Sequence, residues 1–334
     1  MVNDPIVTIG MPIKNRIFCI DRVLTSIASQ TYPKNKIKLI FIDESADGTY
    51  EKLLQWKEQH KEEYLGIQIL RTESKGYIST LRNLCVSNME GNVIFFWDSD
   101  VLAPDNDALN RVIQKVVSSN EVAVAGFHYE REIPSLYEKI LRARTELGGL
   151  GFTAIKKSAF DKVGLFNEKL RVNEDQEFFT RIKLNGFKII FDANTPCLHL
   201  KNGIQQSQSL KHGISEYLSQ LKFYFSYGSL VCSECIKHGS KLDLLRILYY
   251  FALPLIFLLW IFNILKLVLS VTLTSVFFAF YLSISLFYHV WKTKGNRFLG
   301  IVAFAYYIPC GIAISYGYII TLIKSFRKVN VKTA

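Results

Sequence analysis

Up to about residue 243 the chain alternates between short apolar runs and longer stretches with helical periodicity. Residues 6–13 form an apolar run that predicts a first strand. The helix predicted next has an apolar face with a spacing of three, four and three residues: Ile17, Ile20, Leu24 and Ile27. Further strands are predicted at residues 38–42, 67–70, 92–97 and 187–191, and further helices after residue 49, over 79–89 and from residue 174. The run at 92–97 is too apolar to face water on either side, so we expect an α/β fold whose mainly parallel sheet is flanked by helices.

Beyond residue 246 the chain is almost continuously apolar. Crossing a bilayer takes about 20 helical residues, and three segments reach that length: 247–265, 267–290 and 298–323. Core helices of soluble proteins are shorter and keep a polar stripe. We therefore expect an α-helical transmembrane region over 247–323, followed by a basic tail at 324–334. The stretch 206–246 is basic, aromatic and amphipathic, which suits either an interfacial helix or an ordinary packing helix.

Charge adds a direction to this picture. Forty Lys and Arg against 29 Asp and Glu leave a net charge of +11, which fits anionic partners such as nucleotides or a lipid surface. No nucleic-acid-binding module is recognisable, and many basic residues flank the predicted spans, so we expect no nucleic-acid partner. Basic residues before the first span and between the second and third place the N-terminal domain on the cytoplasmic face. The basic tail conflicts with this if all three segments cross, so the number of spans stays open.

The N-terminus has no signal-peptide pattern, and the six cysteines are too scattered for a disulfide framework. Reduced thiols in the cytosol are expected.

Polar clusters follow three of the predicted strands, and in such sheets ligands bind where the carboxyl ends of strands meet. The clusters are residues 14–16, 43–45 and 98–100. Neither a G-x-G-x-x-G nor a P-loop motif is present. Asp98 and Asp100 directly follow a buried strand, where carboxylates need a metal or hydrogen bonds. Their oxygens suit Mg²⁺ or Mn²⁺ bridging a diphosphate, and the alternative is an Asp-rich surface turn.

Five ordered stretches resemble the signatures of family 2 glycosyltransferases, which have the GT-A fold. The first two are TIGMPIKNR at 8–16 and FIDESADGT at 41–49, the latter similar to V-D-D-G-S-T-D-G-T. The third, Gly76 with Arg82-Asn83 and Gly91, is similar to G-x-x-x-A-R-N. The fourth, WDSD at 97–100, stands where the metal-binding D-x-D belongs, and the fifth, at 160–186, is similar to F-x-x-V-G-G-F-D-E followed by an E-D motif. The resemblance covers residues 1–205 and extends to polyprenyl- and dolichyl-phosphate sugar synthases and other enzymes with lipid acceptors.

The resemblance implies an inverting transfer from a UDP- or GDP-linked sugar, with Mn²⁺ or Mg²⁺ as the cofactor. It implies that Asp175 is the general base with Glu174 beside it, and that Asp43 accepts hydrogen bonds from the nucleotide base. The implied nucleotide-sugar-binding residues are Pro12, Asn15, Arg16, Asp43, Ser45, Gly76, Arg82 and Asp98. The implied metal ligands are Asp98, Asp100 and His199.

Several of these residues have ordinary structural alternatives. Acids at 174–175 also stabilise the first turn of a helix, a lone histidine such as His199 is often a core residue, and Arg82 can lie on a helix surface. Ile42 and Glu44 replace an Asp and a Gly of the family motif, which leaves uracil and guanine both open.

No Q-x-x-R-W motif follows the E-D motif. Because Q-x-x-R-W accompanies polymer-building synthases, we expect transfer of one sugar. A catalytic domain held at a membrane suits an acceptor confined to the same membrane. The expected acceptor is a polyprenyl phosphate, a lipid-linked saccharide or a glycolipid, in the assembly of cell-surface glycans or glycoproteins. The alternatives are a processive polysaccharide synthase and a catalytically silent nucleotide-sugar-binding membrane tether. Sugar, nucleotide, acceptor lipid and oligomeric state stay open.

Overall fold

The computed structural model describes residues 4–72, 77–131, 149–170 and 173–200, and further on residues 218, 222, 234, 268–305, 307–309, 311–312 and 316. The chain divides into two compact units, Met1–Pro134 with Leu147–Ser207 and Ser135–Glu146 with Gln208–Ala334. Most of the predicted linker, 206–246, and the whole of the first predicted span, 247–265, lie outside the described residues. The predicted domain boundaries therefore stay a prediction.

The described part of the first unit contains a mixed sheet in the order β3-β2-β1-β4-β7-β6-β8-β5. Its strands are β1 (Val7–Ile13), β2 (Ile37–Asp43), β3 (Gly66–Arg71), β4 (Val93–Trp97), β5 (Val101–Leu102), β6 (Val122–Arg131), β7 (Phe152–Lys156) and β8 (Lys188–His199). β1 pairs in parallel with β2 and β4, as β2 does with β3 and β6 with β8. β7 runs antiparallel to β4 and β6, and β5 antiparallel to β8. The α/β fold with a mostly parallel sheet is confirmed, while the sequence pattern predicted none of β5, β6 and β7.

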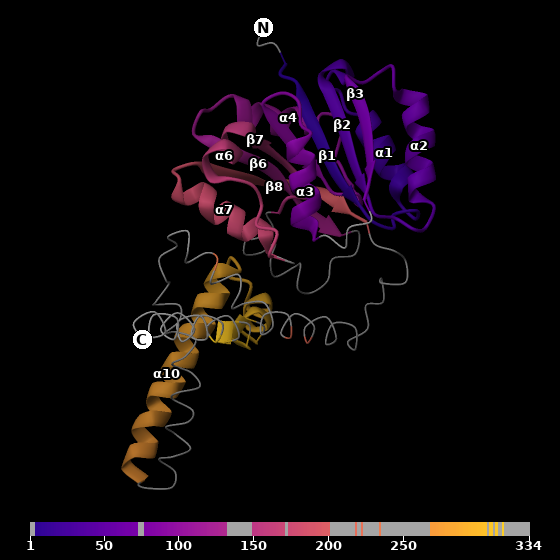
Figure 1. Ribbon diagram of the computed structural model, residues 1–334. Coiled ribbons are helices and arrows are strands. Elements are labelled where there is room, and N and C mark those ends of the chain that lie inside the picture. The colour runs from indigo at the N-terminus through magenta and orange to yellow at the C-terminus, as the bar shows by residue number, and fades with distance from the viewer. Residues whose placement is uncertain are drawn as a thin grey trace, which may run out of the picture. The chain divides into compact units, whose positions relative to one another are not determined.

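Helices cover both faces of this sheet (Figure 1). They are α1 (Ile20–Ala28), the short η1 (Lys34–Lys36), α2 (Thr49–His60), α3 (Ile78–Ser87), α4 (Ala108–Val117), α6 (Lys157–Val163) and α7 (Glu174–Leu184). Buried side chains of α1, α2 and α4 belong to one hydrophobic cluster, and those of α3, α6 and α7 to a second.

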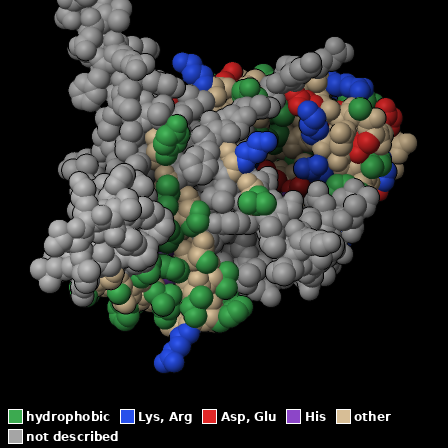
Figure 2. All heavy atoms as spheres, turned by 90° about the horizontal axis from the view of Figure 1, so that it is seen from below, with side chains coloured by type: hydrophobic (Ala, Val, Ile, Leu, Met, Phe, Trp, Pro, Cys, Tyr) green, Lys and Arg blue, Asp and Glu red, His purple; other side chains and the backbone are tan. Residues whose placement is uncertain are grey.

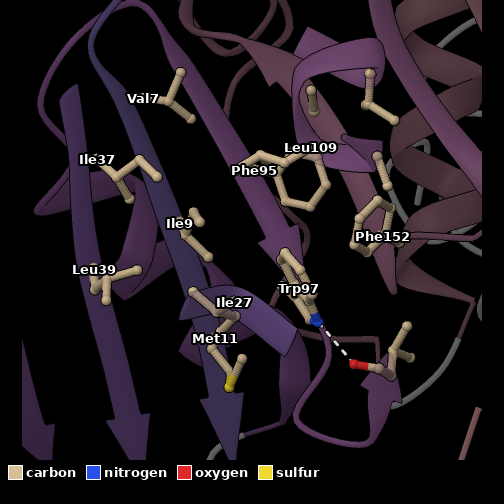
Figure 3. Close-up of a cluster of buried hydrophobic side chains, with 14 of the residues drawn as sticks. Val7, Ile9, Met11, Ile27, Ile37, Leu39, Phe95, Trp97, Leu109 and Phe152 are labelled. Carbon is tan, nitrogen blue, oxygen red and sulfur yellow. Dashed lines mark hydrogen bonds between the residues drawn. The ribbon is translucent and has the colours of Figure 1, made fainter. Parts of the chain in front are cut away.

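Alternation along the central strands divides the core between the two faces. In β4, Phe95 and Trp97 belong to the first cluster, whereas Ile94 and Phe96 belong to the second, and all four are fully buried. Figure 3 shows the first cluster, in which the indole nitrogen of Trp97 donates a hydrogen bond to the carbonyl oxygen of Val101 at 2.8 Å. This bond ties the end of β4 to β5, so the polar turn between them is anchored in the core.

Two local expectations need correction. Ile17 was expected on the apolar face of the first helix, but α1 begins only at Ile20 and Ile17 is 38% exposed. The strand predicted at 187–191 continues to His199, because β8 pairs with β6 and then with β5. Pro12 is buried within β1. Its missing N–H is tolerated there because the pairing of β1 with β4 ends at Gly10.

In the second unit the structure describes helix α10 (Val268–Lys292) and a helical stretch at 297–305. Five of the exposed large apolar side chains of α10 are spaced by four, four, three and four residues, which places them on one face: Val276, Phe280, Ile284, Phe287 and Trp291. Ser285 and His289 are fully buried on the opposite face. Polarity is therefore reversed relative to a helix that packs onto a soluble core.

The second helical stretch crosses α10 closely. A Cβ on Gly300 would lie 2.7 Å from the Cα of Val290, so only glycine permits this approach. The His289 ring stacks on the ring of Tyr307 with centroids 5.7 Å apart. Within the described residues, no helix meets the length and hydropathy needed to cross a membrane. The three predicted spans stay a prediction.

Candidate active site

The carboxyl ends of β1, β2 and β4 bring the three polar clusters to one edge of the sheet. The registers that pair Ile13 with Asp43, and Gly10 with Phe96, make these strands end side by side. Figure 2 shows the molecule from below, where basic and acidic side chains gather around a hollow. The expected meeting of the clusters therefore follows from strand register.

The loop after β1 is held by side chains of the loop after β2. Asn15 has a left-handed φ of 53°, and its N–H donates to Ser45 Oγ at 2.8 Å. The N–H of Arg16 donates to Thr49 Oγ1 at 2.9 Å, and that of Ile17 to a carboxylate oxygen of Asp47 at 3.1 Å. Asn15 and Ser45 are thus hydrogen-bonded to each other, and the bond from Arg16 to Thr49 fixes the backbone of Arg16.

Asp100 is held by two groups from distant parts of the chain. One of its oxygens lies 3.0 Å from Arg16 Nη2, and the other lies 3.3 Å from His199 Nε2. His199 reaches this position because β8 pairs with β5 beside Asp100. Burial alone would raise the pKa of Asp100, but the hydrogen bond from His199 and the charge of Arg16 outweigh it and lower the pKa. The carboxylate therefore stays ionised.

Arg82 joins the first aspartate of the D-x-D to the E-D pair. Its guanidinium is buried, forms an ion pair with Glu174 and lies 3.4 Å from Asp98 Oδ1. The helix-surface alternative for Arg82 is wrong. A buried charge requires ionic partners, and Arg82 finds them in two acids that are far apart in the sequence.

Asp175 lies beside this cluster in the first turn of α7. It is half-buried, and one oxygen accepts the N–H of Gln176 at 2.8 Å. Burial raises the pKa of Asp175, and the Arg82 guanidinium opposes that rise. A carboxylate with a raised pKa is a stronger base than an exposed aspartate. Glu174 is itself paired with Arg82, so of the two acids Asp175 is the one suited to accept a proton.

Asp43 ends β2 as a fully buried carboxylate. Neither of its oxygens has a hydrogen-bond donor among the described residues. An unpaired buried charge is costly, so this position suits a ligand that supplies donors. Gly76, predicted to bind the nucleotide sugar, lies outside the described residues.

The predicted metal ligands fit a divalent cation in kind but are held by arginines. Two carboxylates and an imidazole are donors that Mn²⁺ accepts. In the part of the chain that the structure describes, no three acidic, histidine or cysteine side chains are grouped to hold a metal ion. Instead Arg82 faces Asp98 and Arg16 faces Asp100.

Sequence reasoning missed residues that position the site. The Asn83 amide bonds both backbone groups of Phe166, donating to the carbonyl oxygen at 3.0 Å and accepting the N–H at 2.9 Å. A Cβ on Gly151 would lie 2.9 Å from Asp98 Oδ2, so this glycine makes room for the carboxylate. Asn83 stands in the matched A-R-N stretch, which was a signal for it, whereas Gly151 depends on a strand pairing that the sequence does not reveal.

Comparison with known proteins gives these residues a context. The family model described as Glycosyl transferase family 2 matches residues 8–175, half of the chain. Glycosyltransferase AglE from Haloferax volcanii is 28% identical over 132 residues, which are 39% of this chain and 41% of that protein. The matched stretch therefore spans less than half of the relative's length.

Two solved structures share the fold. The mannosyltransferase PcManGT from Pyrobaculum calidifontis, in complex with GDP-Man and Mn²⁺, has a TM-score of 0.62 and 16% identity, with 91% of this chain and 88% of that chain covered. TarS 1–349 from S. aureus, in complex with UDP-GlcNAc, has a TM-score of 0.50 and 19% identity, with 71% of this chain and 68% of that chain covered. From the family match, which includes the D-x-D and ends at the E-D pair, the chain belongs to glycosyl transferase family 2.

Proposed function

We propose that this glycosyltransferase moves one sugar, with inversion, from a UDP- or GDP-sugar to a lipid-linked acceptor at the cytoplasmic face of a membrane. The observation that carries the proposal is the cluster in which Arg82 links Asp98 to Glu174, next to Asp175. It brings the residues proposed for donor binding and those proposed for catalysis to one strand-end edge. The names of the compared structures include GDP-Man and UDP-GlcNAc, which supports a nucleotide sugar as the donor class.

In this proposal, the residues of the candidate site divide the work of binding and transfer. Asp43 would accept N–H donors of the base, and Arg16 would bind the diphosphate. Asp98, Asp100 and His199 would hold Mn²⁺ or Mg²⁺, which when bound offsets the charge that develops on the departing diphosphate. Asp175 would take the proton of an acceptor hydroxyl as that oxygen attacks the sugar from the face opposite the diphosphate. A phosphate acceptor is already ionised and would need this base less.

The membrane part of the proposal is supported by the C-terminal composition and by α10. The segments 247–265, 267–290 and 298–323 are almost continuously apolar. Phe280 and Phe287 of α10 are 64% and 73% exposed, while His289 is fully buried. Lipid favours helices that expose apolar side chains outward and keep polar side chains between them. Lys292 is the last residue of α10 and Lys294 follows two residues later, where a headgroup region would accept them.

The proposal is tested by measuring nucleotide diphosphate release from the detergent-solubilised full chain. UDP- and GDP-sugars are compared with Mn²⁺ or Mg²⁺, with and without a membrane lipid extract. We expect lipid-dependent release from one donor, which Asp175→Asn abolishes while donor binding persists. The control is Asp161→Asn, which makes the same change at an exposed acid on α6. Binding of nucleotide without turnover of any donor would contradict a transferase and favour the silent tether.

A further inference from the structure

Arg16 occupies the place next to Asp100 that a cation would take. Its Nη2 lies 3.0 Å from Asp100 Oδ2, and the side chains of Arg16 and Asp100 are 31% and 16% exposed. This partly buried pair is screened by water less than a surface pair. The second carboxylate of the D-x-D is therefore already neutralised by the chain itself.

The backbone of Arg16 cannot follow a ligand, but its side chain can. Ser45, Thr49 and Asp47 hold the backbone N–H groups of residues 15–17 through side-chain hydrogen bonds. In the guanidinium, Nη1 donates to the carbonyl oxygens of Lys14 and Asn15, at 2.8 and 3.3 Å. Its buried Nε has no acceptor among the described residues. If Nη2 leaves Asp100 while Nη1 keeps its carbonyl partners, Nε and Nη2 together form a fork that suits a bidentate anion.

Arg82, which faces the other D-x-D carboxylate, is held more firmly. It pairs with Glu174 as well as Asp98, and its side chain is only 7% exposed. Leaving Asp98 would not free it, because Glu174 keeps it in place. Arg16 has one acid partner, so it is the arginine that can exchange one anion for another.

A divalent ion and a guanidinium repel each other when both contact one carboxylate. Metal binding at Asp100 without nucleotide would therefore displace Arg16 and leave its guanidinium without an anion. A bound diphosphate supplies that anion through two or more oxygens. The free energy cost of displacing Arg16 is then offset only when the nucleotide is present.

We propose that Arg16 serves as the resident cation at Asp100 in the nucleotide-free enzyme and passes to the diphosphate when the donor binds, so that metal ion and nucleotide bind cooperatively. The inference rests on the proposed nucleotide-sugar function of this site. It assigns to Arg16 both a binding role and the coupling of two ligands.

The test measures the binding of Mn²⁺ to the detergent-solubilised full chain, with the electron paramagnetic resonance signal of free Mn²⁺ as the readout. For the unmodified chain, we expect GDP or UDP to tighten Mn²⁺ binding by about tenfold or more, within the usual range of coupling. Arg16→Gln should tighten the binding of Mn²⁺ alone by about fivefold and lower the coupling factor by about the same factor, because only the direct contact between metal and diphosphate then couples the two ligands. By thermodynamic reciprocity, the effect of Mn²⁺ on nucleotide affinity should fall by the same factor.

Two further variants separate coupling from charge and from folding. Arg22→Gln makes the same change at an exposed residue of α1, and we expect Mn²⁺ affinity to stay within about twofold, because exposed charges at a distance are screened. Arg16→Lys keeps the charge but not the fork, so the affinity for Mn²⁺ alone should stay near that of the unmodified chain while coupling falls. Unfolding temperatures close to that of the unmodified chain show that the variants are folded.

The outcomes distinguish the inference from the function on which it rests. Unchanged or weaker binding of Mn²⁺ alone by Arg16→Gln, with nucleotide still bound, would overturn the role of Arg16. If neither GDP nor UDP binds any form of the chain, the proposed function fails. In that case the comparison with Mn²⁺ alone still decides whether Arg16 occupies the cation position.

Discussion

Asp43, the residue proposed to bind the nucleotide base, is a buried acid whose charge lacks a partner among the described residues. It is fully buried, and no described residue donates a hydrogen bond to its carboxylate. A buried charge without a partner destabilises the folded state, whereas a nucleotide base carries N–H groups that would pair with it. The charge that would strengthen the proposed nucleotide binding therefore lowers the stability of the folded chain.

Asp43→Asn should change stability and nucleotide affinity in opposite directions. We expect the free energy of unfolding to rise by about 1 kcal/mol, because an unpaired buried amide is less costly than a charge. Nucleotide affinity should fall about tenfold or more, since a hydrogen bond to a charged acceptor is lost. Chemical denaturation and nucleotide titration of the same sample check both signs. A loss of stability together with unchanged nucleotide affinity would contradict the base-binding role.

Asp175 predicts how activity depends on pH. Burial raises the pKa of Asp175 above its ordinary value of 3.8, although the charge of Arg82 opposes the rise. A general base acts in its ionised form, so transfer should be lost as pH falls through this raised pKa. The pH profile of kcat/KM should therefore have an acid limb above pH 3.8. An acid limb at or below that value would argue against Asp175 as the base, and Asp161→Asn provides the control profile.

At the scale of elements, α3 and α7 together hold the segment that precedes the E-D pair. Asn83 of α3 bonds the backbone of Phe166, and Arg181 of α7 donates to the carbonyl oxygens of Val163 and Leu165 at 2.6 and 2.9 Å. Residues 164–170 have little regular structure of their own. Buried side chains therefore satisfy the backbone groups that a helix or strand would otherwise satisfy.

Asn83→Leu should disturb this segment without changing the volume much. Loss of the amide leaves two buried backbone groups of Phe166 unpaired, which should lower the free energy of unfolding by about 2 to 4 kcal/mol. We expect kcat to fall more than nucleotide affinity, because the segment leads to Asp175. Urea unfolding and steady-state kinetics measure the two effects. The control is Asn88→Leu at the end of the same helix, where Asn88 donates only to Leu84 within α3 and contacts Gln68. If both variants reduce kcat equally, Asn83 has no positioning role.

For the whole molecule, the reversed polarity of α10 predicts behaviour with lipid. Replacing Phe280 and Phe287 by lysine removes two exposed aromatic side chains from the apolar face. The transfer of each phenylalanine side chain from water into hydrocarbon is favourable by about 1.5 to 3 kcal/mol. Co-flotation of the full chain with phosphatidylcholine and phosphatidylglycerol vesicles should therefore fall at least about tenfold.

The paired control replaces Leu54 and Leu65 by lysine, because both are exposed large apolar residues of the first unit, at 40% and 42%. Flotation of this control should match that of the unmodified chain. Equal loss in the two double variants would mean that α10 has no particular affinity for lipid.

Local pattern was sufficient for much of the molecule. Strands β1 to β4 and helix α7 were predicted because short continuous apolar runs and period-3.6 apolar patterns depend only on neighbouring residues. The buried face of α7, with Phe178, Phe179 and Ile182, follows from the same periodicity. Family motifs predicted the acids of the candidate site because their order along the chain is itself the signal.

Partners far apart in the chain were decided by the tertiary structure alone. Arg16 meets Asp100, Arg82 meets Glu174, and His199 reaches Asp100 through the pairing of β5 with β8. No local pattern encodes a strand order or a side-chain pairing across the sheet, because these depend on which buried surfaces and charges compensate one another in the folded chain. The sequence alone therefore predicted the charged residues of the candidate site, while the fold decided which arginine pairs with which acid.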